Sequence, residues 1–250
     1  MTVSYTRFDC GTIRPVFPKI QGGTYCLLVE TNQGKLLIDS GYGIRDFIQP
    51  ALRTRLFTGF IRTPRDTETC IINQLKSNSI DPHSVQHIVL THMHLDHAGG
   101  VADFPWATVH VYEQEYQAAL QSIGRLGIGY LQRQWRDHKR WQFYSNQDTT
   151  WFGFNAITMT CFNPQFLLIP TPGHSAGHCM VAFGSGDFWV LQCGSACYPF
   201  YLNQTSNAIQ MPDWLQRWAM GPYLSPLKQL WQQHHEHITF LSGHDFVKRS

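Results

Sequence analysis

The sequence has few charged residues, and this scarcity excludes one class of partner. Asp, Glu, Lys and Arg together make up 14% of the chain, whereas roughly 25% is typical of globular domains. The 19 basic residues barely outnumber the 17 acidic ones, which leaves a formal net charge of +2. Such a balance lacks the concentrated positive charge that holds a phosphate backbone, so we expect no nucleic-acid partner.

Long apolar runs and a disulfide framework are also missing. The uninterrupted apolar runs are only a few residues long, far short of the roughly 20 residues that span a bilayer, so we expect no membrane partner. The first residues show no signal-peptide pattern. The seven cysteines are odd in number and form no C-x-x-C pair, which disfavours a secreted disulfide scaffold or a zinc ribbon. We therefore expect a cytoplasmic protein.

The remaining composition is that of an ordinary globular domain with an excess of histidine. Hydrophobic residues make up 43% of the 250 residues, which is enough to bury a core without staples. No Pro-, Gly- or Ser-rich linker and no block of charge divides the chain, so we expect a single domain over residues 1–250. The 13 histidines exceed what solubility requires.

Short strand patterns alternate with helical patterns along the chain. Strands are expected at residues 25–30, 35–39, 87–90, 108–112, 156–162, 166–169, 178–183, 188–193 and 238–241. Helices are expected at residues 67–79, 113–122, 212–220 and 225–236, with weak helical character over 124–150. Strands interleaved with helices, some of them joined in tight hairpins, favour an α/β fold of the layered α+β kind over a doubly wound parallel sheet.

A histidine-rich stretch follows the expected strand at 87–90. Three imidazoles and a carboxylate fall within the six residues His92-Met93-His94-Leu95-Asp96-His97. His92 and His94 are two residues apart in extended chain, so they point the same way and can hold one metal. Asp96 and His97 lie on the following turn and can face a second ion. Imidazole and carboxylate are ligands that zinc takes, so we predict a metal site here rather than a polar loop with incidental histidines.

Two later segments add further histidines. Thr171-Pro172-Gly173-His174-Ser175-Ala176-Gly177-His178 places a histidine in a Gly-rich turn, and Ser242-Gly243-His244-Asp245 follows a strand. Together with the H-x-H-x-D-H stretch, and in this order, these segments resemble the metallo-β-lactamase superfamily of metal-dependent hydrolases from about Tyr25 to Asp245. The resemblance is strongest to the N-acyl-homoserine lactone lactonases, and the stretch Tyr25-Cys26-Leu27-Leu28-Val29-Glu30-Thr31 also contributes to it.

The resemblance implies a fold and a site. The fold would be an αββα sandwich of two mixed β-sheets flanked by helices, with the metals at one edge. The implied ligands are His92, His94 and His174 for the first metal, and Asp96, His97 and His244 for the second. Asp39 would be a carboxylate supporting a ligand, although a turn aspartate bonded to local backbone is an equal reading. Tyr198 would hydrogen-bond the oxyanion, the alternative being an ordinary packed aromatic.

One position departs from the lactonase pattern. Ser195 stands where the lactonases place an aspartate that bridges both metals. Without this carboxylate the two cations repel each other with less compensation, so we expect a weaker second metal and one or two Zn²⁺, or another divalent ion, per chain. Some metallo-β-lactamases that use two zincs also carry serine here. Cys193 and Cys197 are either two small buried side chains or, alternatively, a source of a thiolate ligand.

These features predict a zinc-dependent hydrolase acting on a small molecule. A zinc-activated hydroxide would open a cyclic ester, with an N-acyl-homoserine lactone as the leading candidate, and Asp96 and Tyr198 would be the catalytic residues. One alternative is a β-lactam or thioester hydrolase of the same fold, and Ser195 favours the lactam. A second alternative is a non-catalytic metal- or ligand-binding member with an impaired site. Family analogy alone allows a homodimer.

The sequence says less about which side chains line the substrate-binding pocket. A group of aromatic residues offers either a wall for an acyl chain or, as the preferred reading, core or interface: Tyr130, Trp135, Trp141, Phe143, Trp151, Phe152 and Phe154.

Overall fold

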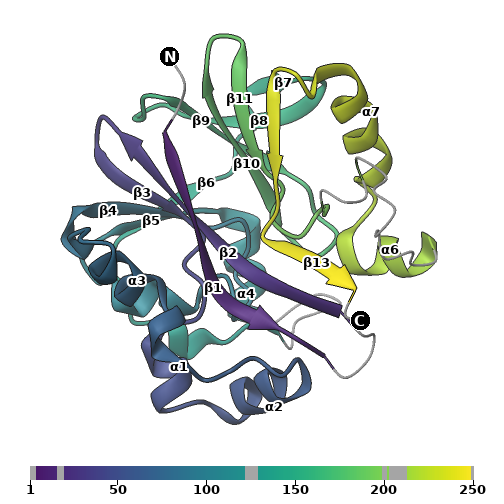
Figure 1. Ribbon diagram of the computed structural model, residues 1–250. Coiled ribbons are helices and arrows are strands. Elements are labelled where there is room, and N and C mark those ends of the chain that lie inside the picture. Colours follow the sequence, from purple (N-terminus) through teal and green to yellow (C-terminus); the bar gives the residue numbers. More distant parts are fainter. Residues whose placement is uncertain (1–3, 16–19, 122–128, 199–201, 203–212, 249–250) are drawn as a thin grey trace.

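Two β-sheets pack face to face in the computed structural model (Figure 1), which describes residues 4–15, 20–121, 129–198, 202 and 213–248. In the first sheet the order is β1-β2-β3-β4-β5-β6, with β13 also paired to β2. Its strands are β1 (Tyr5–Ile13), β2 (Ile20–Thr31), β3 (Gly34–Ile38), β4 (Val85–Val89), β5 (Thr108–Tyr112), β6 (Trp141–Tyr144) and β13 (His244–Lys248). The pairs from β3 to β6 are parallel, and the others are antiparallel.

The second sheet has the order β12-β11-β10-β9-β8-β7. Its strands are β7 (Thr149–Trp151), β8 (Phe154–Met159), β9 (Gln165–Pro170), β10 (Cys179–Ser185), β11 (Phe188–Gln192) and β12 (Ile238–Leu241). Only β11 and β12 run parallel within this sheet. Both sheets are therefore mixed, as the resemblance implies.

Helices cover the outer face of each sheet (Figure 1). On the side of the first sheet lie α1 (Ile44–Ile48), α2 (Leu52–Phe60), α3 (Ile71–Ser77) and α4 (Glu113–Gln121). On the side of the second sheet lie α6 (Asp213–Met220) and α7 (Leu224–His234). Short 3₁₀ turns occur at Thr67–Thr69, Pro82–Ser84, Gly99–Asp103 and Gln132–Gln134. None of the helices in these described ranges is long and apolar enough to cross a bilayer.

The apolar pattern of the inner strands explains this layering. Along β3, Leu36 and Ile38 enter the cluster between the two sheets, while Leu37 enters the cluster between the first sheet and its helices. Successive side chains of a strand point to opposite faces, so a strand covered on both faces is apolar at consecutive positions. A third cluster joins the second sheet to α7 through residues such as Leu227 and Leu230. The αββα layering implied by the resemblance is thus confirmed.

Most of the expected elements are present, and the expected tight hairpins are found between residues 25–30 and 35–39 and between residues 178–183 and 188–193. The β2–β3 hairpin turns at Gly34, whose φ of 96° favours glycine, and β10 pairs with β11. In the described part of 124–150 a 3₁₀ turn forms at Gln132–Gln134, and the weak helical expectation is wrong farther along, where β6 and β7 form. Trp141 and Phe143 alternate along β6, and both rings contact Tyr116 of α4. We expected no element over β1, β13, α1 or α2.

Candidate metal centre

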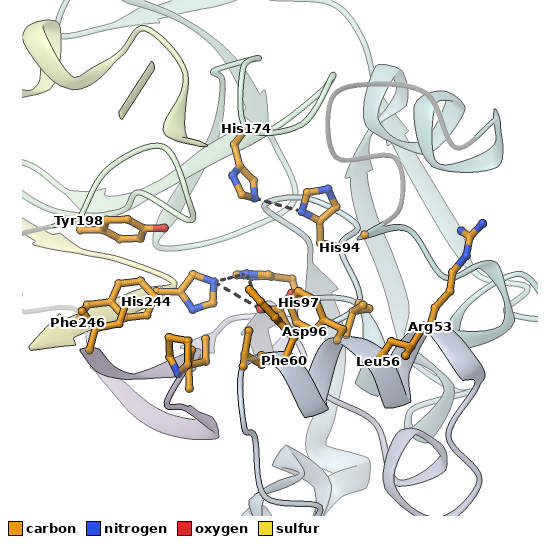
Figure 2. A pocket seen from close by; sticks show the side chains of 17 residues that line it. Arg53, Leu56, Phe60, His94, Asp96, His97, His174, Tyr198, His244 and Phe246 are labelled. Atoms are coloured by element: carbon orange, nitrogen blue, oxygen red, sulfur yellow. Dashed lines mark hydrogen bonds and ion pairs between the residues drawn. The ribbon is translucent and has the colours of Figure 1, made fainter. Parts of the chain in front are cut away.

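The first group of metal-ligating side chains joins the loop after β4 to the turn before β10. Nδ1 of His94 lies 3.1 Å from Nε2 of His174, and the rings of His92 and His174 are 4.8 Å apart between centroids. One ligand atom from each of these three histidines lies within 4.8 Å of the other two. The structure therefore brings together the three residues predicted to hold the first metal (Figure 2 shows His94 and His174).

The second group joins the same loop to β13. Nε2 of His97 lies 3.0 Å from Nε2 of His244. Oδ2 of Asp96 lies 3.5 Å from the His244 nitrogen and 3.8 Å from the His97 nitrogen. The rings of His92 and His97 are 4.0 Å apart, so the two groups adjoin. All six predicted ligands therefore occupy one site, and Figure 2 shows five of them, His94, Asp96, His97, His174 and His244.

Contacts behind the rings orient four of the histidines. Nδ1 of His97 contacts Oδ2 of Asp39 at 2.9 Å, and Nδ1 of His244 contacts the Gly23 carbonyl at 3.0 Å. The other two Nδ1 contacts are those of His92 with Thr91 Oγ1 and of His174 with the Ala219 carbonyl. Such contacts fix the ring orientation and direct Nε2 toward a metal.

Several histidine Nε2 atoms in the site present lone pairs that a cation can accept. The Gly23 carbonyl can only accept, so Nδ1 of His244 carries the hydrogen and a neutral ring presents a lone pair at Nε2. The Asp39 carboxylate sets the same tautomer on His97. Two lone pairs would then meet at 3.0 Å, which a shared proton or a metal ion resolves. Nε2 of His92 and of His94 are buried without a hydrogen-bond partner. The site thus fits a divalent ion such as zinc.

Burial sets the charge state of most of these imidazoles. It lowers the pKa of His92, His94 and His244, and it lowers the pKa of His174 to about 4. These rings are therefore neutral near pH 7, which is the form that binds a metal. His97 differs: burial opposes its charge, but the nearby carboxylates of Asp96 and Asp39 outweigh that effect and raise its pKa.

Glu115 supports the site and was not predicted from the sequence. This fully buried residue of α4 accepts hydrogen bonds from the Met93 backbone at 2.8 Å, the Ser175 hydroxyl at 2.8 Å and the Gly177 backbone at 2.9 Å. It therefore ties the His92–His97 loop to the turn that carries His174. The sequence offered no signal for this role, since Glu115 looks like any glutamate in the first turn of an exposed helix.

Ser195 lies beside the ligand groups. Its backbone N–H donates to Nε2 of His178 at 3.0 Å, and the ring of His178 is 5.1 Å from that of His92. The Ser195 hydroxyl is buried and has no hydrogen-bond partner among the described atoms. Cys193 and Cys197 lie instead in the apolar cluster under the second sheet, and neither joins the ligand groups found in the described chain. The reading of both cysteines as small buried side chains is the one the structure supports.

A pocket of about 670 Å³ opens over the ligands. Its polar floor includes His94, Asp96, His97, His174 and His244, and Tyr198 borders it with its hydroxyl end toward the histidines (Figure 2). The rest of the lining is mostly apolar and includes Ile13, Ile20, Leu56, Phe57, Phe60 and Phe246, together with Arg53. The aromatic residues expected around 130–154 do not line this pocket; Tyr130 and Trp135, for example, are core residues. The preferred reading of these aromatics as core is thus confirmed for Tyr130 and Trp135, and the alternative of a substrate wall is wrong for this pocket.

Comparisons with known proteins agree with this architecture. The family profile described as Metallo-beta-lactamase superfamily matches residues 20–190. A relative from Mycobacterium tuberculosis, named probable metallo-hydrolase Rv2300c, is 36% identical over 198 residues, which cover 78% of this chain and 63% of the relative. The N-acyl homoserine lactonase AttM of Agrobacterium fabrum is 33% identical over 153 residues, covering 60% of this chain and 56% of that protein. The chain thus spans less than two thirds of the length of these relatives.

Solved structures share the fold at low sequence identity. An N-acyl homoserine lactone hydrolase, solved with N-hexanoyl-L-homoserine at its catalytic metal centre, superposes with a TM-score of 0.68 at 21% identity, covering 98% of this chain and 94% of that one. A probable metal-dependent hydrolase from Staphylococcus aureus gives a TM-score of 0.70 at 18% identity, covering 97% and 89% of the two chains. The sequence match over residues 20–190 and the shared fold establish that this chain belongs to the metallo-beta-lactamase superfamily.

Proposed function

We propose that this protein is a metal-dependent hydrolase that opens a lactone ring and that N-acyl homoserine lactones are its substrate class. One observation carries the proposal: five of the six residues in the two metal-ligating groups line one pocket, and the rest of its lining is mostly apolar. A substrate with a polar carbonyl end and an acyl chain matches both surfaces. Its reacting ester would lie over the histidines, and its chain would lie along Leu56 and Phe60.

Each part of the site has a role in this reaction. A divalent metal, when bound, supplies Lewis-acid polarisation of the carbonyl and a bound water with a pKa near 7. Tyr198 borders the floor and can donate its O–H to the oxygen that gains negative charge. Asp96 reaches the pocket and can take up the proton that the attacking water loses and pass it to the leaving alkoxide. Phe57, Phe60 and Leu56 exclude water from the acyl half of the substrate.

A second substrate class is favoured by one residue. Ser195 lies beside the ligand groups where the lactonase pattern has a carboxylate, and a serine at this point accompanies β-lactam cleavage in some members of the fold. A thioester hydrolase and a non-catalytic member remain the lesser alternatives. The buried, unpaired histidine nitrogens favour a metal-loaded centre and so weigh against an impaired site.

Metal content and substrate profile test the proposal together. The zinc-loaded protein is assayed against N-hexanoyl and N-decanoyl homoserine lactone, a chromogenic β-lactam and a thioester, before and after chelation. We expect lactone opening that disappears with the metal and in His94→Ala, but persists in His235→Ala, a control at the exposed end of α7. Hydrolysis of only the β-lactam or the thioester would transfer the proposal to that substrate, and inactivity of the metal-loaded protein toward all of them would refute it.

A further inference from the structure

Helix α2 turns most of its apolar side chains toward solvent, although Phe57 packs against the core. The buried side chains of this helix are Thr54 and Thr58, whereas Leu52, Leu56 and Phe60 are 71%, 65% and 71% exposed. Helices of soluble domains normally bury their apolar stripe and expose their polar one. Ile48, four residues before Leu52 at the end of α1, is 63% exposed and extends the same spacing. We call Ile48, Leu52, Leu56 and Phe60 the apolar row.

Exposed arginines are interspersed along the segment that carries the apolar row. Residues 44–65 contain five of the chain's 19 basic residues, all of them exposed: Arg45, Arg53, Arg55, Arg62 and Arg65. The single acidic residue in this segment, Asp46, is buried. Outside the segment acidic residues outnumber basic ones, so the small net charge of the chain hides a local concentration of positive charge. Exposed apolar side chains together with exposed arginines are the two features by which a protein surface binds anionic lipid.

We propose that the face formed by residues 44–65 docks onto a lipid surface that contains anionic phospholipid. The apolar row would enter the boundary between headgroups and acyl chains, and the arginines would pair with lipid phosphates. Charge decides against a second copy of this chain as the occupant. A two-fold contact through the row would bring two sets of arginines together, and like charges in contact repel.

The docking face continues into the pocket. Arg53, Leu56 and Phe60 belong to the face and also line the pocket over the metal ligands (Figure 2). An amphiphile held in the lipid layer could therefore enter the pocket without crossing open water. The docking itself does not rest on the proposed reaction, because it requires only the exposed row and its arginines. The proposed docking differs from our expectation of no membrane partner. That expectation rested on the absence of membrane-spanning runs and does not address a peripheral contact.

Cosedimentation with vesicles tests the docking face. The metal-loaded full chain is mixed with vesicles of phosphatidylcholine alone and with vesicles of equal parts phosphatidylcholine and phosphatidylglycerol. The test variants leave the pocket-lining residues unchanged: Ile48→Ser with Leu52→Ser, and Arg45→Gln with Arg55→Gln and Arg65→Gln. The matched controls alter exposed residues elsewhere: Phe188→Ser, and Arg136→Gln with Lys139→Gln and Arg140→Gln. Circular dichroism melting checks that every variant folds.

The expected pattern is binding to the anionic vesicles only, weakened by salt. The arginine variant should lower partitioning on the order of a hundredfold, the apolar variant by at least about tenfold, and the controls should bind like the parent. Equal binding of parent and test variants would overturn the proposal, as would absence of binding to either vesicle by the folded parent. A parent dimer that becomes monomeric in the apolar variant, without vesicle binding, would assign the row to self-association instead. None of these outcomes depends on hydrolysis.

Discussion

Nδ1 of His97 lies 2.9 Å from Oδ2 of Asp39, and both side chains are fully buried. Oδ1 of the same carboxylate accepts the Thr91 backbone N–H at 2.8 Å. Asp39 follows β3 with a φ of 60°, in the left-handed region that aspartate and asparagine tolerate better than most residues. The carboxylate therefore joins the end of β3 to the histidine loop after β4 and fixes the direction in which His97 presents Nε2.

Asp39→Asn should weaken metal binding without unfolding the protein. Asparagine tolerates the same backbone conformation, but its neutral amide no longer favours the Nδ1–H tautomer of His97 as strongly. We expect metal affinity to fall by roughly 10- to 100-fold, as measured by competition with a chelating dye. Asp187→Asn, in the exposed β10–β11 turn, is the control and should bind metal like the parent. Unchanged affinity in Asp39→Asn would show that the contact does not position His97.

Ser195→Asp should strengthen binding of the second metal. The hydroxyl of Ser195 is already buried beside the ligand groups, and a carboxylate there would offset the repulsion between two cations. Elemental mass spectrometry should show zinc content rising toward two ions per chain if the parent holds fewer. Ser195→Asn adds similar volume without charge and should leave the content unchanged. Equal content in the aspartate and asparagine variants would contradict the charge explanation.

Tyr198→Phe should slow turnover and leave metal content intact. The hydroxyl end of Tyr198 faces the pocket floor (Figure 2), and loss of an oxyanion donor typically costs about a hundredfold or more in kcat. A change confined to KM would instead show that the hydroxyl binds the substrate and the transition state equally, and unchanged kinetics would show that only the ring contributes. The assay uses the lactone identified by the substrate profile, with metal content measured on the same sample.

Asp46 should make the fold less stable as the pH rises through the mildly acidic range. Burial raises the pKa of this carboxyl to about 6, against hydrogen bonds from Gln134 and Gly43 that lower it. The unfolded chain releases the proton near pH 4, whereas the folded chain keeps it up to about pH 6. The free energy of unfolding therefore falls by up to about 3 kcal/mol as the pH rises from about 4 to 6. Above pH 6 both states are ionised and this effect is constant.

Urea unfolding of the parent and Asp46→Asn at a series of pH values measures this effect. Both hydrogen bonds to Asp46 end on Oδ2, so one amide oxygen can accept them. In the variant, the free energy of unfolding should fall less between pH 4 and 6, because the Asp46 carboxyl is gone. Some decrease should remain, because burial also raises the pKa of Asp103 to about 6. Parallel stability curves for the two proteins would show that the Asp46 pKa is not raised.

The positions of the metal-ligating histidines could be foreseen because short loops at strand ends carry them. His92, His94 and His97 are close in sequence, and a buried strand places them at a sheet edge. Glu115 could not be foreseen, since its role depends on two loops that only tertiary packing brings together. Helix α2 escaped prediction for a different reason. Periodicity identifies a helix by the apolar face that it buries, and this helix buries threonines instead.

The path of the chain after β12 has a consequence for how the centre is completed during synthesis. β12 belongs to the second sheet, yet β13 crosses back to pair with β2 of the first. The ribosome has therefore made His92, His94 and His174 before it makes β11 and β12. The second group, Asp96, His97 and His244, is complete only after β13 has been made. In a nascent chain the first group has all its ligands while the second still lacks one. The order of residues thus gives the two halves of the centre an assembly sequence that refolding from denaturant would not impose.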